Sequence, residues 1–347
     1  MPINTIFQAM HIRSKTNRNV MQNIDRLYLI SQTAQSPQQL LDALHPWKDN
    51  TDLYFHNAIP VILAIVGAIL FLSSVFLSAF IPWSYGLVCA LLCALISYLM
   101  YEPRKPIHAV IQHLEMKMKL LRFDIHYNQV PKIIATPSAS KNLLNRLQLH
   151  FPMFNLGNHS NEFEHYAAST WQCPNGHTHS ILLFKYHYSS EQFVPNGKIK
   201  ADNLKISHTN LWGAFVFNIP PLGLAISNTR DSFFKPYVYS WKTSDIHLNK
   251  ILKIYGTDPK QMAKHISPQL TLKLEALFLN NKVDLISHYN EHILCYISNK
   301  NIFSVRANRT IDKIKNISDL RGYLRTLNMP HYTAFKSQLL DILSLIR

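Results

Sequence analysis

The chain has 347 residues and a formal net charge of +15, with 35 Lys and Arg against 20 Asp and Glu. Its near-neutral mean hydropathy of -0.04 excludes a protein that is apolar throughout, so the apolar residues must be concentrated in particular segments. The four cysteines do not form the framework of a disulfide-rich domain, which favours a reducing compartment.

Residues 1–57 are polar and basic, and the helical spacing of their apolar residues predicts a cytosolic helical segment. Within it, Ser36-Pro37-Gln38-Gln39 has the residues of a helix start, with a capping Ser and a Pro at the first helical position. We expect a short helix from there to Leu44. The amphipathic pattern of the segment suits either lipid contact or packing on the C-terminal domain.

Two apolar runs at 58–80 and 84–101 contain no Asp, Glu, Lys or Arg and are separated by Ile81-Pro82-Trp83. About 20 helical residues span a hydrocarbon core of ~30 Å. The runs therefore predict a transmembrane hairpin at 58–101, with the first run acting as an uncleaved signal anchor. The alternative is a buried helical pair in a soluble protein, although soluble core helices rarely stay uncharged over this length.

The charges around the hairpin predict its orientation. The loop between the runs is uncharged, whereas Lys48 precedes them and several basic residues follow. By the positive-inside rule, both termini should lie in the cytoplasm. The basic residues that follow the hairpin are Arg104, Lys105, Lys117, Lys119 and Arg122.

Residues 102–150 are predicted to form a juxtamembrane helix followed by a linker. Apolar residues recur there at alternating spacings of four and three, which is typical of a helix with one apolar stripe. The stripe must be covered either by the chain's own domain or by a second helix in a coiled coil, and its short length favours the first. Its residues are Ile107, Ile111, Leu114, Met118, Leu121 and Ile125.

From residue 151 to residue 347 the pattern predicts a cytosolic α+β domain. Segments at 163–171 and 179–188 alternate as strands, and the turn between them contains the hairpin dipeptide Asn175-Gly176. Helices are predicted after Asp258, after Ser267 and near the C-terminus. Strands and helices segregate along the chain, which favours α+β over a doubly wound fold. Further strands are predicted at 199–206, 211–219, 222–227, 237–241, 251–255, 283–288, 293–298 and 302–305.

Catalytic motifs are missing from the sequence: it has no G-x-G-x-x-G loop, Walker A cradle, G-x-S-x-G elbow or H-E-x-x-H helix. One constellation suits chemistry, because Cys173, His177 and His179 offer a thiolate and two imidazoles, a set that Zn²⁺ prefers. A fourth ligand would come from His165 or His187. The alternative is an ordinary hairpin with a polar turn, because 18 histidines form local pairs by chance.

The chain resembles a group of uncharacterised bacterial membrane proteins, the domain-of-unknown-function 3137 family, over roughly residues 55–345. The resemblance implies an inner-membrane location and a hairpin followed by a cytosolic domain, and it implies no catalytic residues. The family's acidic and glycine-rich turn in the first β-hairpin is replaced here by Cys173–His177. The matching residues are Trp212-Gly213-Ala214-Phe215-Val216-Phe217, Leu248-Asn249-Lys250-Ile251-Leu252-Lys253-Ile254-Tyr255, Asp258, Ala263, Ile266-Ser267-Pro268, Leu270, Leu274, Leu277 and Ile302-Phe303.

These patterns predict a membrane-anchored binding or scaffold protein that acts through protein contacts of its cytosolic domain, with another protein or a second copy as partner. No catalytic residue is indicated, and no cofactor other than zinc. One alternative is a membrane-tethered, zinc-dependent enzyme that uses Cys173, His177 and His179. The other is a nucleic-acid-binding domain held at the membrane, which the scattered arrangement of the basic residues disfavours.

Overall fold

The computed structural model describes residues 13–45, 47, 51–76, 83–131, 139–193, 204–279 and 282–346. The predicted break at Ile81-Pro82 and positions 199–203 of one predicted strand lie outside these residues. The chain divides into two compact units, which are described separately. Unit 1 comprises Met1–Arg122 and Ala307–Leu327, and unit 2 comprises Phe123–Arg306 and Asn328–Arg347.

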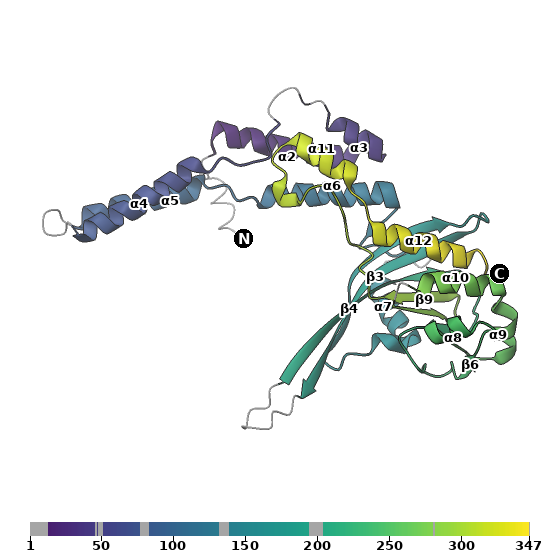
Figure 1. Ribbon diagram of the computed structural model, residues 1–347. Helices are drawn as coiled ribbons and strands as arrows, with labels where there is room; N and C mark the ends of the chain where they lie inside the picture. The colour runs from purple at the N-terminus through teal and green to yellow at the C-terminus, as the bar shows by residue number, and fades with distance from the viewer. Residues whose placement is uncertain are drawn as a thin grey trace. The chain divides into compact units, whose positions relative to one another are not determined.

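Unit 1 is helical in the part that the structure describes (Figure 1). Its α3 (Pro37–Ala43) contacts both α2 (Lys15–Thr33) and α11 (Ile317–Thr326). The predicted helix start at Ser36 is confirmed, because the Ser36 hydroxyl accepts a hydrogen bond from the Gln39 amide at 3.1 Å. Before α11 lies the short 3₁₀ helix η3 (Ile311–Lys313).

Two consecutive helices of unit 1, α4 (Ala58–Phe76) and α5 (Trp83–Met100), are long and apolar enough to cross a membrane. They pack side by side (Figure 1). A Cβ atom at Gly67 would lie 3.2 Å from the Ala90 carbonyl oxygen, so a glycine allows this close approach of the two backbones. Outside that contact the helices bury very little, and Pro60, Gly67 and Ala90 are their buried residues.

The predicted apolar stripe lies on α6 (Lys105–Phe123), which begins shortly after α5 ends. Ile107, Ile111, Leu114 and Met118 are completely buried. The partners belong to the same chain: the Tyr28 ring of α2 contacts the His113 ring in a tilted arrangement with centroids 5.5 Å apart, and the Tyr323 hydroxyl of α11 donates to the Glu115 carboxylate at 2.6 Å. The stripe is therefore covered by packing within unit 1, except for its last residue, Ile125, which belongs to unit 2.

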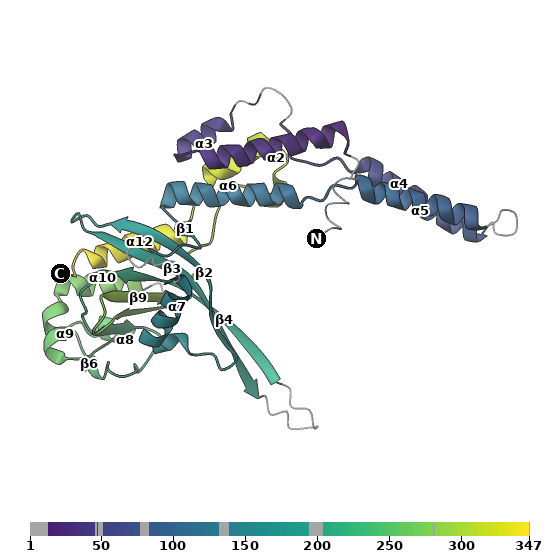
Figure 2. The same ribbon diagram turned by 180° about the vertical axis from the view of Figure 1, so that it is seen from behind.

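Unit 2 is built on one antiparallel sheet of nine strands, ordered β1-β2-β3-β4-β9-β8-β5-β7-β6, and helices pack on both of its faces (Figure 2). The predicted α+β class is confirmed. The strands are β1 (His126–Tyr127), β2 (Ser160–Gln172), β3 (Thr178–Phe193), β4 (Leu204–Phe217), β5 (Leu224–Ser227), β6 (Tyr239–Trp241), β7 (Lys253–Gly256), β8 (Val283–Ser287) and β9 (Ile293–Ser298). The helices are α7 (Ala139–His150), η2 (Pro152–Phe154), α8 (Ile246–Ile251), α9 (Pro259–His265), α10 (Pro268–Phe278) and α12 (Pro330–Leu343).

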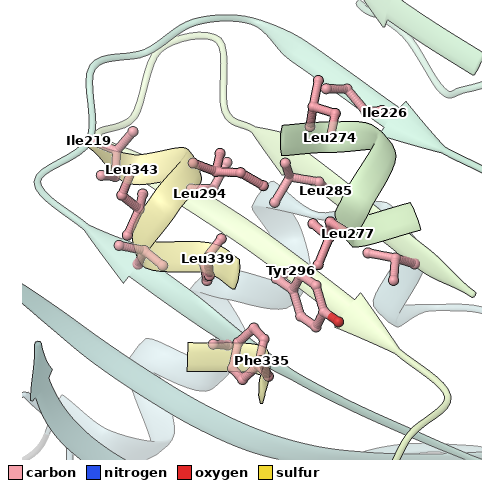
Figure 3. Packing of buried hydrophobic residues seen from close by; sticks show 14 of the residues in the cluster. Ile219, Ile226, Leu274, Leu277, Leu285, Leu294, Tyr296, Phe335, Leu339 and Leu343 are labelled. Carbon is pink, nitrogen blue, oxygen red and sulfur yellow. The ribbon is translucent and has the colours of Figure 1, made fainter. Parts of the chain in front are cut away.

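Each face of the sheet buries its own apolar cluster because successive strand residues point to opposite faces. Along β9, Leu294 and Tyr296 join one cluster, whereas Ile293, Cys295 and Ile297 join the other. The first cluster is covered by α10 and α12 and is mostly aliphatic (Figure 3). The second is rich in aromatic residues, among them Phe151, Phe154, Phe184, Tyr186 and Phe215.

The two predicted strands 199–206 and 211–219 are one continuous strand in the described residues, β4. Two further strand predictions differ from the structure. The predicted strand 302–305 is a turn, in which Ile302 is buried against the aliphatic cluster without pairing to a neighbour. In the predicted strand 251–255, Ile251 instead ends α8, and β7 begins at Lys253. In both segments the apolar pattern correctly indicates that residues are buried. Buried apolar residues also occur at helix ends and in turns, so the pattern does not by itself identify a strand.

Candidate functional site

The three predicted zinc ligands lie at the β2–β3 hairpin. The Cys173 amide donates to the His177 carbonyl at 2.8 Å, and the Gly176 amide donates to the Cys173 carbonyl at 2.9 Å. Gly176 has a φ of 86°, a left-handed conformation that glycine adopts without strain. The predicted turn is therefore confirmed, and it is closed by backbone hydrogen bonds.

The side chains of the three residues have different environments. Cys173 is buried in the aliphatic cluster, and this burial raises the pKa of its thiol. His177 is exposed in the turn. His179 is 8% exposed, opposite Trp171 in the strand register. Burial lowers the pKa of its imidazole, a hydrogen bond to the Phe217 backbone opposes that shift, and its Nδ1 atom has no hydrogen-bond partner in the described structure.

The two predicted fourth ligands lie far from this turn. His165 stands opposite Lys185, six positions beyond His179 along β3, and a strand rises ~3.3 Å per residue. His187 is two positions further. Neither imidazole can complete a site with Cys173, which would require ligands within about 2 Å of one metal ion. Among the described residues no three His, Cys, Asp or Glu side chains are grouped to hold a metal ion, and the zinc set Cys173, His177 and His179 stays a prediction.

A polar cluster does surround His187, on the outer part of β2, β3 and β4. Its Nδ1 atom lies 3.1 Å from the Asn210 side-chain oxygen, and its Nε2 atom lies 3.3 Å from Nδ1 of His208. Glu164, at an irregularity in the β2–β3 pairing, forms an ion pair with Lys185. The hydrogen bond from Lys185 is the main cause of the lowered pKa of the Glu164 carboxyl. The cluster's polar groups thus satisfy one another.

Two buried polar groups have structural roles. The Asp284 carboxylate accepts hydrogen bonds from Ser227, from the Thr229 hydroxyl at 3.0 Å and from Arg230 Nε at 2.9 Å, which fixes the loop after β5. The His288 Nδ1 atom accepts the Asn290 and Glu291 amides at 3.2 and 2.8 Å, and burial is the main cause of the lowered pKa of this imidazole. Both groups are engaged in holding turns.

A small polar pocket of about 140 Å³ opens between the end of β9 and α12. Tyr296 is buried there, and burial raises the pKa of its hydroxyl to about 12. Sequence reasoning did not find the pocket, since its two walls are far apart in the chain. Its lining residues are Tyr296, Ser298, Lys300, Ile302, His331, Ala334, Phe335 and Gln338.

In unit 1, a group of polar contacts closes the base of the α4–α5 hairpin. The Asn57 side chain donates to the Glu102 carbonyl at 2.8 Å and accepts the Glu102 amide at 3.1 Å. Asn17 of α2 makes the same reciprocal pair with the backbone of His56, and Arg13 forms an ion pair with the buried Glu102 carboxylate. We call these five residues the hairpin clamp. It ties both ends of the hairpin to each other and to α2.

Comparisons of the chain with protein families, with curated proteins and with solved structures find no match.

Proposed function

We propose that the protein is a membrane-anchored binding or scaffold protein, with the α4–α5 hairpin as anchor and unit 2 as the module that contacts a partner. The observation that carries the anchor is the exposed apolar surface of these two helices. Large side chains that are exposed there are Ile59, Val61, Ile62, Ile65, Val66, Ile69, Phe71, Leu72, Val75, Phe76, Trp83, Tyr85, Val88, Leu91, Leu92, Leu95, Ile96 and Tyr98.

The magnitude of this exposure supports a lipid environment. Moving one large apolar side chain out of water is favourable by about 1.5–3 kcal/mol. Summed over the hairpin, this amounts to tens of kcal/mol, more than the ~5–15 kcal/mol that keeps a typical domain folded. A hydrocarbon core would remove these side chains from water, and the helices contain no charged residue that would oppose insertion.

The proposed location is a bacterial inner membrane, crossed twice, with both termini in the cytoplasm. The basic residues Arg104 and Lys105 directly after α5 support this orientation. The bacterial assignment rests on the resemblance to the domain-of-unknown-function 3137 family.

Contact with another protein is supported by apolar side chains on neighbouring elements of unit 2. Elements α8 and α10 are in contact. Isolated exposed apolar residues are ordinary, whereas a group on adjoining elements is typical of interaction surfaces. The exposed residues are Ile246 on α8, Leu272 on α10 and Leu279 directly after α10.

Reporter fusions test the anchor. Fusions after Asn50 and after Arg347 should both report cytoplasm, and a fusion near Trp83 should report the far side. A chain that is released from membranes by alkaline carbonate would contradict the anchor altogether. A far-side C-terminus would contradict the orientation alone.

Site-specific photo-cross-linking of the full chain in its native membrane tests the contact. A cross-linker at Ile246 should capture one specific protein or a second copy, and a cross-linker at the exposed Ser318 of unit 1 serves as control. Leu272→Asp, at an exposed position of the neighbouring α10, should abolish capture by the cross-linker at Ile246 while the chain stays folded. A turnover activity that is lost with single polar substitutions in the pocket at Ser298 and His331 would favour an enzyme instead.

A further inference from the structure

We infer that the base of the hairpin carries a binding surface for anionic phospholipid headgroups, formed by five exposed basic side chains, and this inference rests on the proposed membrane anchor. We call this set the basic collar. Its members are Lys15, Arg18, Lys105, Lys313 and Lys315.

Hydrogen bonds place two collar residues beside the start of α4. Lys15 and Arg18 lie in the first turn of α2, on either side of Asn17. The Asn17 side chain accepts the His56 amide at 2.9 Å and donates to the His56 carbonyl at 3.4 Å. Because α4 begins two residues after His56, these two cations stand next to the point at which the hairpin begins.

The other three collar residues lie beside the end of α5. Lys105 begins α6, three positions after Glu102 of the hairpin clamp. Arg104 Nη2 donates to the Asp312 carbonyl at 2.8 Å and to the Ile314 carbonyl at 3.1 Å. Lys313 and Lys315 flank Ile314, so these contacts bring both of them to the same end of the hairpin.

The length of the hairpin sets the depth of the collar. Helices α4 and α5 have 19 and 18 residues, which at ~1.5 Å per residue gives ~28 Å, close to the hydrocarbon thickness of ~30 Å. Residues just outside Ala58 and Met100 therefore lie at the headgroup layer. Tyr54, Tyr98 and Tyr101 are exposed at the same end, as aromatic residues at a membrane interface are.

The charge at this end is predominantly positive. Arg104 adds to the collar, because the hydrogen bonds of its guanidinium go to carbonyl oxygens, which carry no formal charge. The buried Glu102 carboxylate forms an ion pair with Arg13. Among the described residues, the exposed acidic side chains at this end of the hairpin are Asp52 and Asp312. Each Lys or Arg at a membrane surface favours anionic lipid by roughly 1 kcal/mol. Phosphodiester headgroups are the partner that fits both this charge and this depth.

Lipid selectivity of the full chain tests the inference. The chain is reconstituted in phosphatidylcholine bilayers with spin-labelled phosphatidylglycerol or phosphatidylcholine as probe, and electron spin resonance gives the protein-restricted fraction of each. We expect phosphatidylglycerol to be favoured at least about threefold, less so in 1 M NaCl. Replacing the five collar residues by Gln should bring the ratio close to one, and Lys15→Arg, Lys105→Arg, Lys313→Arg and Lys315→Arg together should keep it.

A matched variant separates the collar from overall charge. It replaces five exposed lysines of unit 2 by Gln, namely Lys242, Lys250, Lys253, Lys260 and Lys264. This variant should keep the selectivity. Equal loss in both variants, or full selectivity in the collar variant, would overturn the inference. So would loss of selectivity on adding inorganic phosphate or a short RNA at constant ionic strength. Absence of any restricted lipid for both probes would instead overturn the membrane anchor.

Discussion

Helices α5 and α6 follow each other in unit 1 and have almost the same length. They differ in whether their apolar side chains are exposed or buried. Of α5, Ala90 is buried and large residues such as Leu91 are exposed. Of α6, the apolar stripe from Ile107 to Met118 is buried against α2 and α11, and Met116 is exposed on the far side. The difference lies in distribution: α5 is apolar all round, whereas α6 is apolar on one face.

This comparison indicates that the two helices suit different surroundings. A helix with one apolar face is stable where protein covers that face and water covers the other. A helix without a polar face has no side suited to water, which agrees with the proposed membrane anchor.

A charge in the stripe of α6 should have the largest effect. Ile111 is completely buried, so Ile111→Asp removes its packing and buries an unpaired carboxylate, which should lower the free energy of unfolding of unit 1 by at least ~4 kcal/mol. Membrane insertion should be unchanged. The control is Met116→Asp, at an exposed position of the same helix. Denaturant unfolding in detergent micelles measures both, and equal effects would show that the stripe is not the buried face.

A charge in α5 should act on insertion instead. Leu91 lies near the middle of α5 and is exposed, so Leu91→Arg places a cation in hydrocarbon at a cost of about 2.5–3.5 kcal/mol. The fraction of the chain that stays in the membrane after alkaline carbonate extraction should therefore decrease. Met116→Arg in α6 is the matched control and should remain fully bound. If the Leu91→Arg chain were inserted as well as the Met116→Arg chain and were equally stable, this would contradict a lipid environment for α5.

The hairpin clamp, at the junction of the two helices, should have a moderate effect. Asn57→Ala removes the two hydrogen bonds to the Glu102 amide and carbonyl, and a typical hydrogen bond contributes ~0.5–1.5 kcal/mol. We expect a lower thermal midpoint of unit 1 with unchanged insertion. Asn23→Ala, which removes a hydrogen bond to the Asp52 carbonyl at an exposed site, should have a smaller effect. The reverse order would contradict the role of the clamp.

Local patterns predicted much of this architecture. The turn at Asn175-Gly176, the helix start at Ser36 and the buried face of α6 are each encoded within a few residues. What covers that face was not predictable, because periodicity shows that a face is buried and does not name its partner. The contribution of Ala307–Leu327 to unit 1 is an example.

The candidate sites were less predictable for the same reason. The Cys173 and His177 turn is local, yet the Cys173 side chain is buried in the core and His177 is exposed in the turn. The polar pocket joins Ser298 to His331, and the collar joins Lys15 to Lys313. Such sites arise from tertiary contacts that no short pattern contains.

Two cysteines allow the exposed surface of α5 to be compared with the buried core of unit 2 at single side chains. Cys89 is exposed on α5, and Cys173 is buried in the aliphatic cluster of unit 2. Cys173→Ala should destabilise unit 2 by about 1 kcal/mol, and Cys89→Ala should have no measurable effect. Because burial raises the pKa of the Cys173 thiol and zinc requires a thiolate, we expect no metal to be lost in the variant. Stoichiometric zinc in the full chain that disappears with Cys173→Ala would favour the zinc enzyme.

Lowering the pH should destabilise unit 2 slightly and should leave the α4–α5 hairpin unchanged. Burial is the main cause that lowers the pKa of His288 and of His179 below the ordinary value of 6.5, so below that pH the unfolded chain binds more protons than the folded one. Their contribution to stability is therefore present above pH 6.5 and is lost as pH falls through 6.5 towards the folded pKa. Hydrogen exchange at pH 7 and pH 5, corrected for intrinsic rates, should show unit 2 opening more readily at pH 5.

The hairpin provides the internal reference for this measurement, because α4 and α5 contain no Asp, Glu, Lys, Arg or His and their amides should keep the same protection at both pH values. In unit 2, His288→Gln removes one titrating group and should reduce the pH dependence, whereas His247→Gln, at an exposed position, should leave it unchanged. His288→Gln should also weaken the β8–β9 turn at pH 7, since the imidazole Nδ1 accepts the Asn290 and Glu291 amides. A loss of protection in the hairpin at pH 5, or an equal response of both variants, would mean that the acid effect does not arise from imidazoles buried in protein.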